Sequence, residues 1–115
     1  MSKIEFDKLK TPCYIIDKQK FIENTDCMRS AFKERWGDNI TLGYSVKTNH
    51  FPYYMQLSKS LGYHAEVVSG SEFNYALSQG FSKFIYNGPC KDEETLIDAL
   101  SLECIINVDN FGDIE

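Results

Sequence analysis

The sequence predicts an α/β protein built around a parallel sheet. Short runs rich in β-branched and aromatic residues alternate with segments whose apolar residues recur at helical spacing. The expected strands end near residues 47, 69, 87 and 109, at intervals of 22, 18 and 22 residues. Units of this length are typical of two folds, a doubly wound sheet and an eightfold barrel. Four strands are half of what a closed barrel needs, so we expect the chain to be a piece of a larger protein.

The first predicted strand and helix precede residue 37. The run TPCYIID at residues 11–17 is rich in β-forming residues and is opened by Thr-Pro. Asp17 is a favoured helix-capping residue, and Gly37 is a favoured stop. Between them the helical pattern runs through Phe21, Ile22, Thr25, Met28, Ala31 and Phe32.

The second unit contains the stretch YSVKTN at residues 44–49. Residues 40–46, ITLGYSV, predict a strand that ends next to Lys47. Pro52 suits the first turn of the following helix, because the amide that proline lacks would have no helical partner there. This helix ends at Gly62, and its apolar side chains are Tyr54, Leu57 and Leu61.

The third unit has a distinct helix start. Residues 65–69, AEVVS, predict a strand, and SGSE at 69–72 fits a capping box. In that arrangement Ser69 accepts a hydrogen bond from the third amide of the helix, while Glu72 reaches back toward the helix start. The helix ends at Gly80, and its apolar side chains are Phe73, Ala76 and Leu77.

The fourth unit is followed by one more strand. Residues 83–87, KFIYN, predict a strand, and GPCKDEE at 88–94 indicates a turn and an acidic first helical turn that suits the helix dipole. The apolar stripe of this helix is Leu96, Ala99 and Leu100. Residues 104–109, CIINVD, predict the last strand.

Composition excludes several classes of function. The chain has 115 residues, of which 43% are hydrophobic and 25% charged, and a net charge of −5. Its twelve Lys and Arg residues are scattered, so we expect neither nucleic acid nor a membrane surface as a partner. No signal peptide or long apolar span is present, which predicts a cytoplasmic protein. The four cysteines form no C-x-x-C pair, so we expect free thiols and no metal site.

Alternation along the second predicted strand separates bulky side chains from small ones. The bulky face suits packing against helices, whereas the small face leaves room beside a lysine, as a bulky cofactor would require. The bulky face holds Leu42, Tyr44 and Val46, and the small face holds Gly43, Ser45 and Lys47.

The same alternation predicts a polar rim, because chemistry in α/β barrels lies at the carboxyl ends of the strands. The other inward residues are Glu66, Val68, Ile85, Asn87, Ile105, Asn107 and Asp109, and the candidate rim residues are Asn49, Asn87 and Asp109. Several candidate site residues also have simpler explanations. Lys47 can be a solvated strand end, Glu72 and Asp109 can be helix caps, and Asn87 can belong to a turn.

Five segments together resemble a known family. TPCYIID, YSVKTN, AEVVSGSEF, YNGPCKDEETL and INVDN are similar, in order and spacing, to the N-terminal half of pyridoxal-phosphate-dependent decarboxylases with an alanine-racemase-type barrel. That family includes diaminopimelate, ornithine, arginine and carboxynorspermidine decarboxylases. The likeness runs from about residue 11 to the end of the chain.

The resemblance implies a partial (β/α)8 barrel, with the rest of the barrel and a β-domain beyond residue 115. It divides the chain into an N-terminal strand segment, residues 1–16, and half of a pyridoxal-phosphate-binding barrel, residues 17–115. It also implies a homodimer that decarboxylates a small amino acid, either diaminopimelate-like or basic. Alone, the 115-residue piece would be inactive.

The resemblance assigns roles to four residues. Lys47 would form the Schiff base with pyridoxal 5'-phosphate. Glu66 stands where many relatives have an aspartate near the cofactor, and Ser69 and Glu72 match the VVSGGE motif. Two alternatives stay open. One is a racemase or D-amino-acid lyase on the same barrel, although HFPYY after the lysine differs from the YGHG-like stretch of alanine racemases. The other is a decarboxylase-like binding protein without catalysis.

Overall fold

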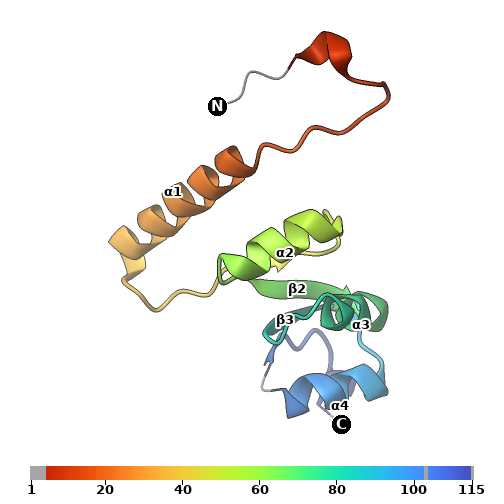
Figure 1. Ribbon diagram of the computed structural model, residues 1–115. Coiled ribbons are helices and arrows are strands. Elements are labelled where there is room, and N and C mark those ends of the chain that lie inside the picture. The colour runs from red at the N-terminus through yellow and green to blue at the C-terminus, as the bar shows by residue number, and fades with distance from the viewer. Residues whose placement is uncertain (1–4, 103, 115) are drawn as a thin grey trace.

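A computed structural model describes residues 5–102 and 104–114, and from α1 to β4 helices alternate with strands as predicted (Figure 1). Within these ranges the helices are η1 (Phe6–Lys8), α1 (Lys18–Trp36), α2 (Pro52–Ser60), α3 (Gly70–Ser78), α4 (Glu93–Ser101) and η2 (Phe111–Asp113). The strands are β1 (Gly43–Ser45), β2 (His64–Ser69), β3 (Phe84–Cys90) and β4 (Ile105–Ile106). Among the described residues, no helix is both long enough and apolar enough to cross a membrane.

The four strands are all parallel and lie in the order β1-β2-β3-β4. Each strand therefore pairs with the next strand of the chain. A doubly wound sheet reverses its strand order at a switch point, whereas an α/β barrel joins sequential neighbours. Of the two folds that the alternation left open, the described strands form the barrel type.

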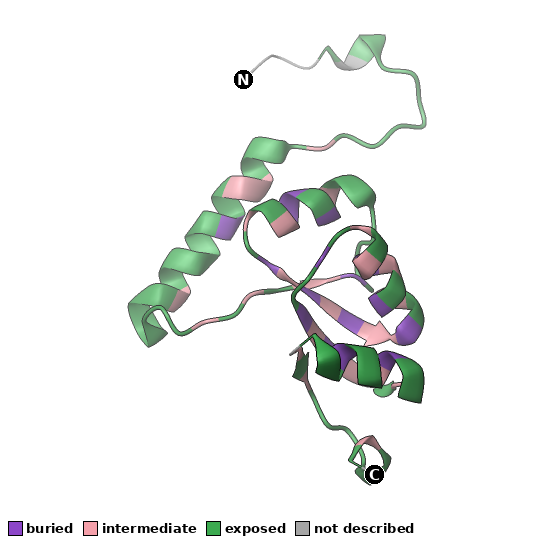
Figure 2. Ribbon diagram, turned by 60° about the horizontal axis from the view of Figure 1, so that its bottom comes forward, coloured by how far each residue is buried: buried purple, intermediate pink, exposed green. Residues whose placement is uncertain are grey.

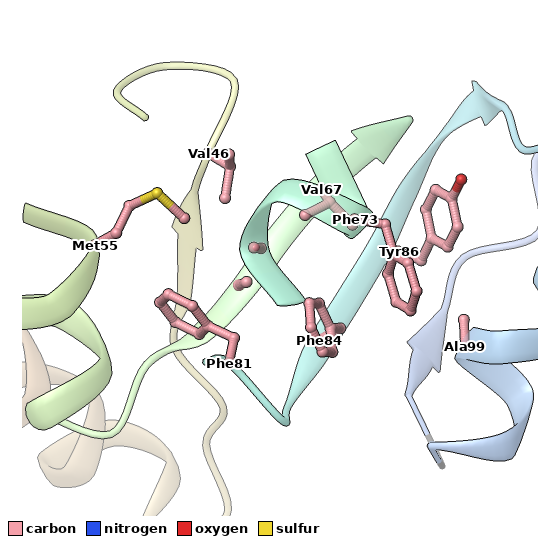
Figure 3. Packing of buried hydrophobic residues seen from close by; sticks show 10 residues of the cluster. Val46, Met55, Val67, Phe73, Phe81, Phe84, Tyr86 and Ala99 are labelled. Carbon is pink, nitrogen blue, oxygen red and sulfur yellow. The ribbon is translucent and has the colours of Figure 1, made fainter. Parts of the chain in front are cut away.

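One face of the sheet carries the hydrophobic core (Figure 3). The ring of Phe73 on α3 packs with its centroid 4.7 Å from that of Phe84 and 5.7 Å from that of Tyr86. Full burial of such a side chain contributes about 1.5–3 kcal/mol to stability. The sheet supplies Ala65, Val67, Phe84 and Tyr86, the turn after β1 supplies Val46, and the helices supply Met55, Phe73, Ala76 and Ala99. Because α2, α3 and α4 all cover this face, the opposite face is left for other contacts.

The predicted helix starts are confirmed. The side chains of Asp17 and Ser69, the two predicted caps, accept hydrogen bonds from the amide three residues later, at 2.9 and 3.3 Å. Asp92, which was not predicted as a cap, does the same for α4 at 3.0 Å. Each cap satisfies an amide that has no partner inside the helix. The capping box at Ser69 has one difference from the predicted form. Glu72 accepts its hydrogen bond from the amide of Val68, one residue before the cap, at 3.0 Å.

The buried faces of three helices differ from the prediction. In α1 the predicted apolar residue Met28 is 39% exposed. In α4, Leu100 is 63% exposed and Thr95 is buried instead. The reason is a hydrogen bond of 3.1 Å between the hydroxyls of Thr95 and Tyr86, which turns Thr95 toward the core. In α2, Met55 is fully buried, whereas Tyr54 is only half-buried.

The strand predicted at residues 11–17 is not formed. Tyr14 is fully exposed and Ile15 is 47% exposed. A strand requires a hydrogen-bonding neighbour, and no described strand pairs with this segment. The segment leads into α1, which leans away from the sheet (Figure 1) and in which Thr25 is the buried residue (Figure 2).

Three other strands end at residues different from those predicted. β1 stops at Ser45, because the chain turns there, so Lys47 lies in the turn. β3 continues to Cys90 through a bulge at Gly88, where a turn was predicted. Gly88 has φ 124°, and a Cβ there would lie 2.9 Å from the carbonyl oxygen of Val68, so glycine suits this position. β4 has two residues, the amide of Asn107 after it still donates to the carbonyl oxygen of Tyr86, and the amide of Asp109 turns to the carboxylate of Asp113.

Candidate active site

The face of the sheet opposite the core carries the small and polar side chains that the alternation predicted. Ser45 is paired in register with Glu66, and Glu66 with Ile85. A Cβ on Gly43 would lie 3.1 Å from Cδ1 of Ile85 and 3.2 Å from Cβ of Glu66. These distances show that Gly43, Glu66 and Ile85 share one face. We call it the inner face.

Lys47 lies in the turn that follows β1. The amides of Thr48 and Asn49 both donate to the carbonyl oxygen of Ser45, at 3.2 and 3.3 Å, and this double contact forms the turn. Lys47 is exposed. Among the described residues, its ammonium group makes neither an ion pair nor a hydrogen bond. The turn therefore presents an amine that no other group of the described chain engages.

Two tyrosine hydroxyls hold the chain that follows this turn. Tyr44 donates to the carbonyl oxygen of Asn49 at 2.8 Å, and Tyr75 donates to that of His50 at 3.0 Å. Burial, together with the nearby Tyr54, raises the pKa of Tyr44 to about 12. Its hydroxyl therefore stays protonated and remains a donor at neutral pH. The side chain of Asn49, a predicted rim residue, accepts from the amide of Phe51 at 3.0 Å.

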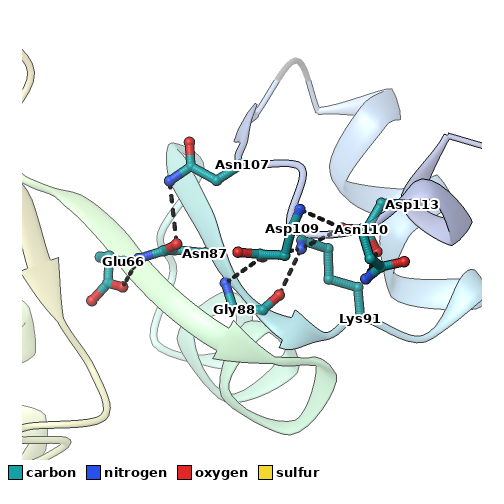
Figure 4. Close-up of polar contacts among 8 residues, drawn as sticks. All are labelled: Glu66, Asn87, Gly88, Lys91, Asn107, Asp109, Asn110 and Asp113. Carbon is teal, nitrogen blue, oxygen red and sulfur yellow. Dashed lines mark hydrogen bonds and ion pairs between the residues drawn. The ribbon is translucent and has the colours of Figure 1, made fainter.

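A row of polar side chains crosses two strands and the segment after β4 on the inner face (Figure 4). Nδ2 of Asn87 donates to Oε1 of Glu66 at 3.2 Å, and Nδ2 of Asn107 donates to Oδ1 of Asn87 at 3.3 Å. These contacts join β2 and β3 to the segment after β4. The carboxylate of Glu66 is thereby held from one side, close to the strand that leads to Lys47.

Ser69 is the last residue of β2 and the cap of α3, and Glu72 lies in the first turn of α3. Both are engaged in capping, since Ser69 accepts from the amide of Glu72 and Glu72 accepts from that of Val68. Glu72 thus ties the end of β2 to the helix that follows. The structure places this pair beside the carboxyl end of the sheet, but in a supporting role for the backbone.

Asp109 belongs to a second cluster, centred on Lys91 (Figure 4). The side chain of Lys91 is 0% exposed, and its ammonium lies 2.7 Å from Oδ2 of Asp109 and 2.9 Å from Oδ2 of Asp113. It also donates to the carbonyl oxygen of Gly88 at 2.6 Å. Desolvation acts to lower the pKa of Lys91, but the hydrogen bonds to the two carboxylates outweigh it, and the pKa is raised. Hydrogen bonds from Lys91 and the amide of Asp109 lower the pKa of Asp113.

The structure thus sorts the residues singled out in the sequence. Lys47 follows β1, Glu66 lies on the neighbouring strand β2, and Asn87 contacts Glu66. Asp109 is engaged by Lys91 instead. The sequence reasoning missed Lys91 and Tyr75. No local sequence pattern connects Lys91 with an aspartate 18 residues later. The sequence also does not show whether Tyr75 lies on the polar or the buried face of its helix. In the described ranges, no three His, Cys, Asp or Glu side chains gather as metal ligands.

Comparison with known families gives a match over most of the chain. Residues 18–115 match the family described as pyridoxal-dependent decarboxylase, pyridoxal binding domain. The chain is 34% identical, over 108 residues, to a probable chloroplastic diaminopimelate decarboxylase of Oryza sativa, and the match covers 92% of this chain and 21% of that protein.

Solved structures agree with this match. The crystal structure of diaminopimelate decarboxylase from M. jannaschii overlaps with a TM-score of 0.80 at 29% identity, covering 94% of this chain and 26% of that one. The Helicobacter pylori enzyme complexed with L-lysine overlaps with a TM-score of 0.75 at 28% identity, covering 95% and 28%. The predicted fold class, part of an alanine-racemase-type barrel, is confirmed by these overlaps. The chain spans about a fifth to a quarter of the length of such relatives.

Proposed function

Since this chain belongs to the pyridoxal-dependent decarboxylases through their pyridoxal-binding domain, we propose that the protein removes carbon dioxide from an amino acid with pyridoxal 5'-phosphate as its cofactor. The observation that carries the proposal is the position of Lys47. Its amine follows the carboxyl end of β1, is exposed and is unengaged by the described residues. A strand end of this kind is where α/β barrels place their reactive groups.

The residues around Lys47 suit this cofactor. A primary amine is the group that condenses with the aldehyde of pyridoxal. Gly43 and Ser45 add no bulky side chain of their own to the inner face beside the lysine, and Ile85 and Glu66 pack closely against Gly43. Glu66 adds an anionic acceptor, held by Asn87. The amine of Lys47 and the carboxylate of Glu66 therefore fit a cofactor with an aldehyde and polar ring substituents.

Four residues of this chain would form the cofactor site, two by contact and two by support. Lys47 would bind it through Nζ, and the same amine, once released, is placed to carry a proton. Glu66 would orient it through its carboxylate, while Ser69 and Glu72 keep the start of α3 in position. When bound, pyridoxal phosphate supplies a ring that takes up the electron pair left by the departing carboxylate.

For the substrate we propose diaminopimelate. The relatives with the matching sequence and fold are named diaminopimelate decarboxylases, and the H. pylori structure is complexed with L-lysine. Lysine is diaminopimelate without one carboxylate, so that ligand is the product expected of such a reaction. We further propose that residues 17–115 form half of the barrel, that residues 1–16 are a separate segment, and that the full-length protein is a homodimer.

The first experiment tests Lys47. Pyridoxal phosphate added to the full-length protein should produce a near-visible absorbance band, and borohydride should fix the cofactor on the peptide containing Lys47, as seen by mass spectrometry. Lys47→Ala should abolish both signals. The control Lys18→Ala, at an exposed position on α1, should keep both. A band that persists in Lys47→Ala after borohydride treatment and dialysis would show the assignment to be wrong.

The second experiment tests the reaction. The full-length protein should release carbon dioxide from diaminopimelate, and release from a panel of other L- and D-amino acids should be lower. Racemisation without carbon dioxide release would instead identify a racemase. If neither occurs while the cofactor is bound, the protein is a binding protein of this family.

A further inference from the structure

The segment from Lys47 to Phe51, which we call the lysine loop, joins Val46, whose side chain is buried in the core, to α2. Lys47, Asn49 and His50 are exposed, and α2 begins after Phe51 without a side-chain cap. A hollow of about 350 Å³ lies against this loop. It is lined by Phe21, Tyr44, Ser45, Thr48, Asn49 and Tyr54. Side-chain packing therefore does little to fix the loop on this side.

Two tyrosine hydroxyls fix the loop through hydrogen bonds instead. Tyr44 reaches the carbonyl oxygen of Asn49 from β1, and Tyr75 reaches that of His50 from α3. The Tyr75 ring also meets the ring of His50 edge to face, with centroids 6.3 Å apart. The two donors come from different elements and form hydrogen bonds with the carbonyl oxygens of two consecutive residues. Together they fix the position of the loop relative to the sheet and to α3.

We propose that Tyr75 and Tyr44 are positioning residues for Lys47, which hold the lysine loop so that the amine is presented to the cofactor. This inference rests on the proposed function. Lys47 lies two residues before Asn49 and three before His50. A shift of these two carbonyl groups is therefore transmitted to the Cα of Lys47. A loop with freely moving carbonyls would have to be ordered when the cofactor binds, and binding would be weaker by that cost.

A purely structural role is the competing explanation, and Tyr86 offers a matched control. Its hydroxyl also makes one hydrogen bond, of 3.1 Å to Thr95, but in the core on β3. Tyr86→Phe should lower the melting temperature of the full-length protein and leave the lysine loop and cofactor binding within twofold of the parent. Any change beyond that in Tyr75→Phe or Tyr44→Phe is then specific to the loop.

The first measurement needs no cofactor. In the apo full-length protein, hydrogen–deuterium exchange of the amides at residues 48–51 should become about fivefold faster in Tyr75→Phe and in Tyr44→Phe, as expected for the loss of one ordinary hydrogen bond. Exchange in α4 should stay unchanged. If the loop exchanges at the parent rate in both variants, the hydroxyls do not hold it and the proposal fails.

The second measurement is the dissociation constant of pyridoxal phosphate, followed by the near-visible band. Each variant should bind two- to fivefold more weakly than the parent, and the double variant should bind most weakly. Faster loop exchange with unchanged affinity would overturn the positioning role. If the parent protein itself takes up no cofactor on Lys47, the proposed function fails and the positioning role with it. That result is distinguishable, because the exchange arm reports on the loop independently.

Discussion

Among single residues, Lys91 has the most unusual surroundings. Its ammonium is enclosed by the carboxylates of Asp109 and Asp113 and by the carbonyl of Gly88. Gly88 in turn donates its amide to Asp109 at 3.2 Å. Asn87, which contacts Glu66, directly precedes Gly88. The cluster therefore also fixes the strand end that carries Asn87. A buried cation with satisfied partners is costly to disrupt, since removing one partner leaves the others without compensation.

Lys91→Met should therefore lower the melting temperature several times more than Lys33→Met. The two lysines form ion pairs of the same length, 2.7 Å, but Lys33 and its partner Asp38 are 63% and 83% exposed. Exposed pairs contribute little because water screens them. Thermal unfolding of both variants in the full-length protein provides the comparison. Equal losses would mean that burial of Lys91 has no energetic consequence.

The same cluster predicts a loss of stability in acid. The folded-state pKa of Asp113 is lowered, so the unfolded chain binds more protons as the pH falls. The stability from this group is complete above the ordinary aspartate pKa of 3.8 and is lost as the pH falls below it. Asp113→Asn should flatten the dependence of unfolding free energy on pH in that range. A slope identical to that of the parent would contradict the prediction.

At the scale of elements, the starts of α3 and α4 meet at Gly70. Gly70 is buried, and a Cβ there would collide with Oδ2 of Asp92 and lie 3.0 Å from Cγ2 of Thr95. Asp92 caps α4, so the two helices are in contact through the residue that starts one of them. The absence of a side chain at Gly70 allows this close approach.

Gly70→Ala should destabilise the protein, although alanine favours helices by about 1 kcal/mol over glycine. The added methyl would displace the Asp92 cap, and such overpacking typically costs about 1–3 kcal/mol. Ser71→Ala, at the exposed next position, is the matched control and should be neutral or slightly stabilising. Denaturant unfolding of the full-length variants measures both. A stabilised Gly70→Ala would show that the helices can move apart.

On the scale of the whole molecule, the two faces of the sheet differ. The core face is closed by α2, α3 and α4, whereas Ile85 and Val68 on the inner face are half-buried and Ile105 is 44% exposed. Large apolar side chains are also exposed on α4 and after it. They are Ile97, Leu100, Leu102, Val108, Phe111 and Ile114. Exposed apolar surface and unpaired strand edges favour association.

Residues 1–115 expressed alone should therefore self-associate and bind a hydrophobic dye such as anilinonaphthalene sulfonate. Light scattering and dye fluorescence, compared with those of the full-length protein, measure this. Ile105→Lys, on the exposed edge strand β4, should reduce association by placing a charge there. A monomeric segment without dye binding would show that this surface is covered in another way.

How much could be predicted from the sequence depends on how far apart the interacting residues lie along the chain. Helix starts could be predicted, because Asp17 and Ser69 act on amides three residues away. Strand ends could not, because side-chain and turn contacts set them. The amide of Asp109 leaves the sheet for Asp113, and a bulge carries β3 to Cys90. The capping role of Glu72 was predicted, but its partner, the amide of Val68, depends on how β2 enters the helix.

The sequence by itself determined the alternation of helix and strand, the face of β1 that carries Gly43 and Ser45, and the lysine that follows. These features depend on periodicity and on contacts between near neighbours. Only the tertiary structure decided the sequential strand order, the enclosure of Lys91 and the hydrogen bond from Tyr75 to the lysine loop. Each of these joins residues that lie 18 to 25 positions apart. Such contacts form only when the sheet and its helices are assembled.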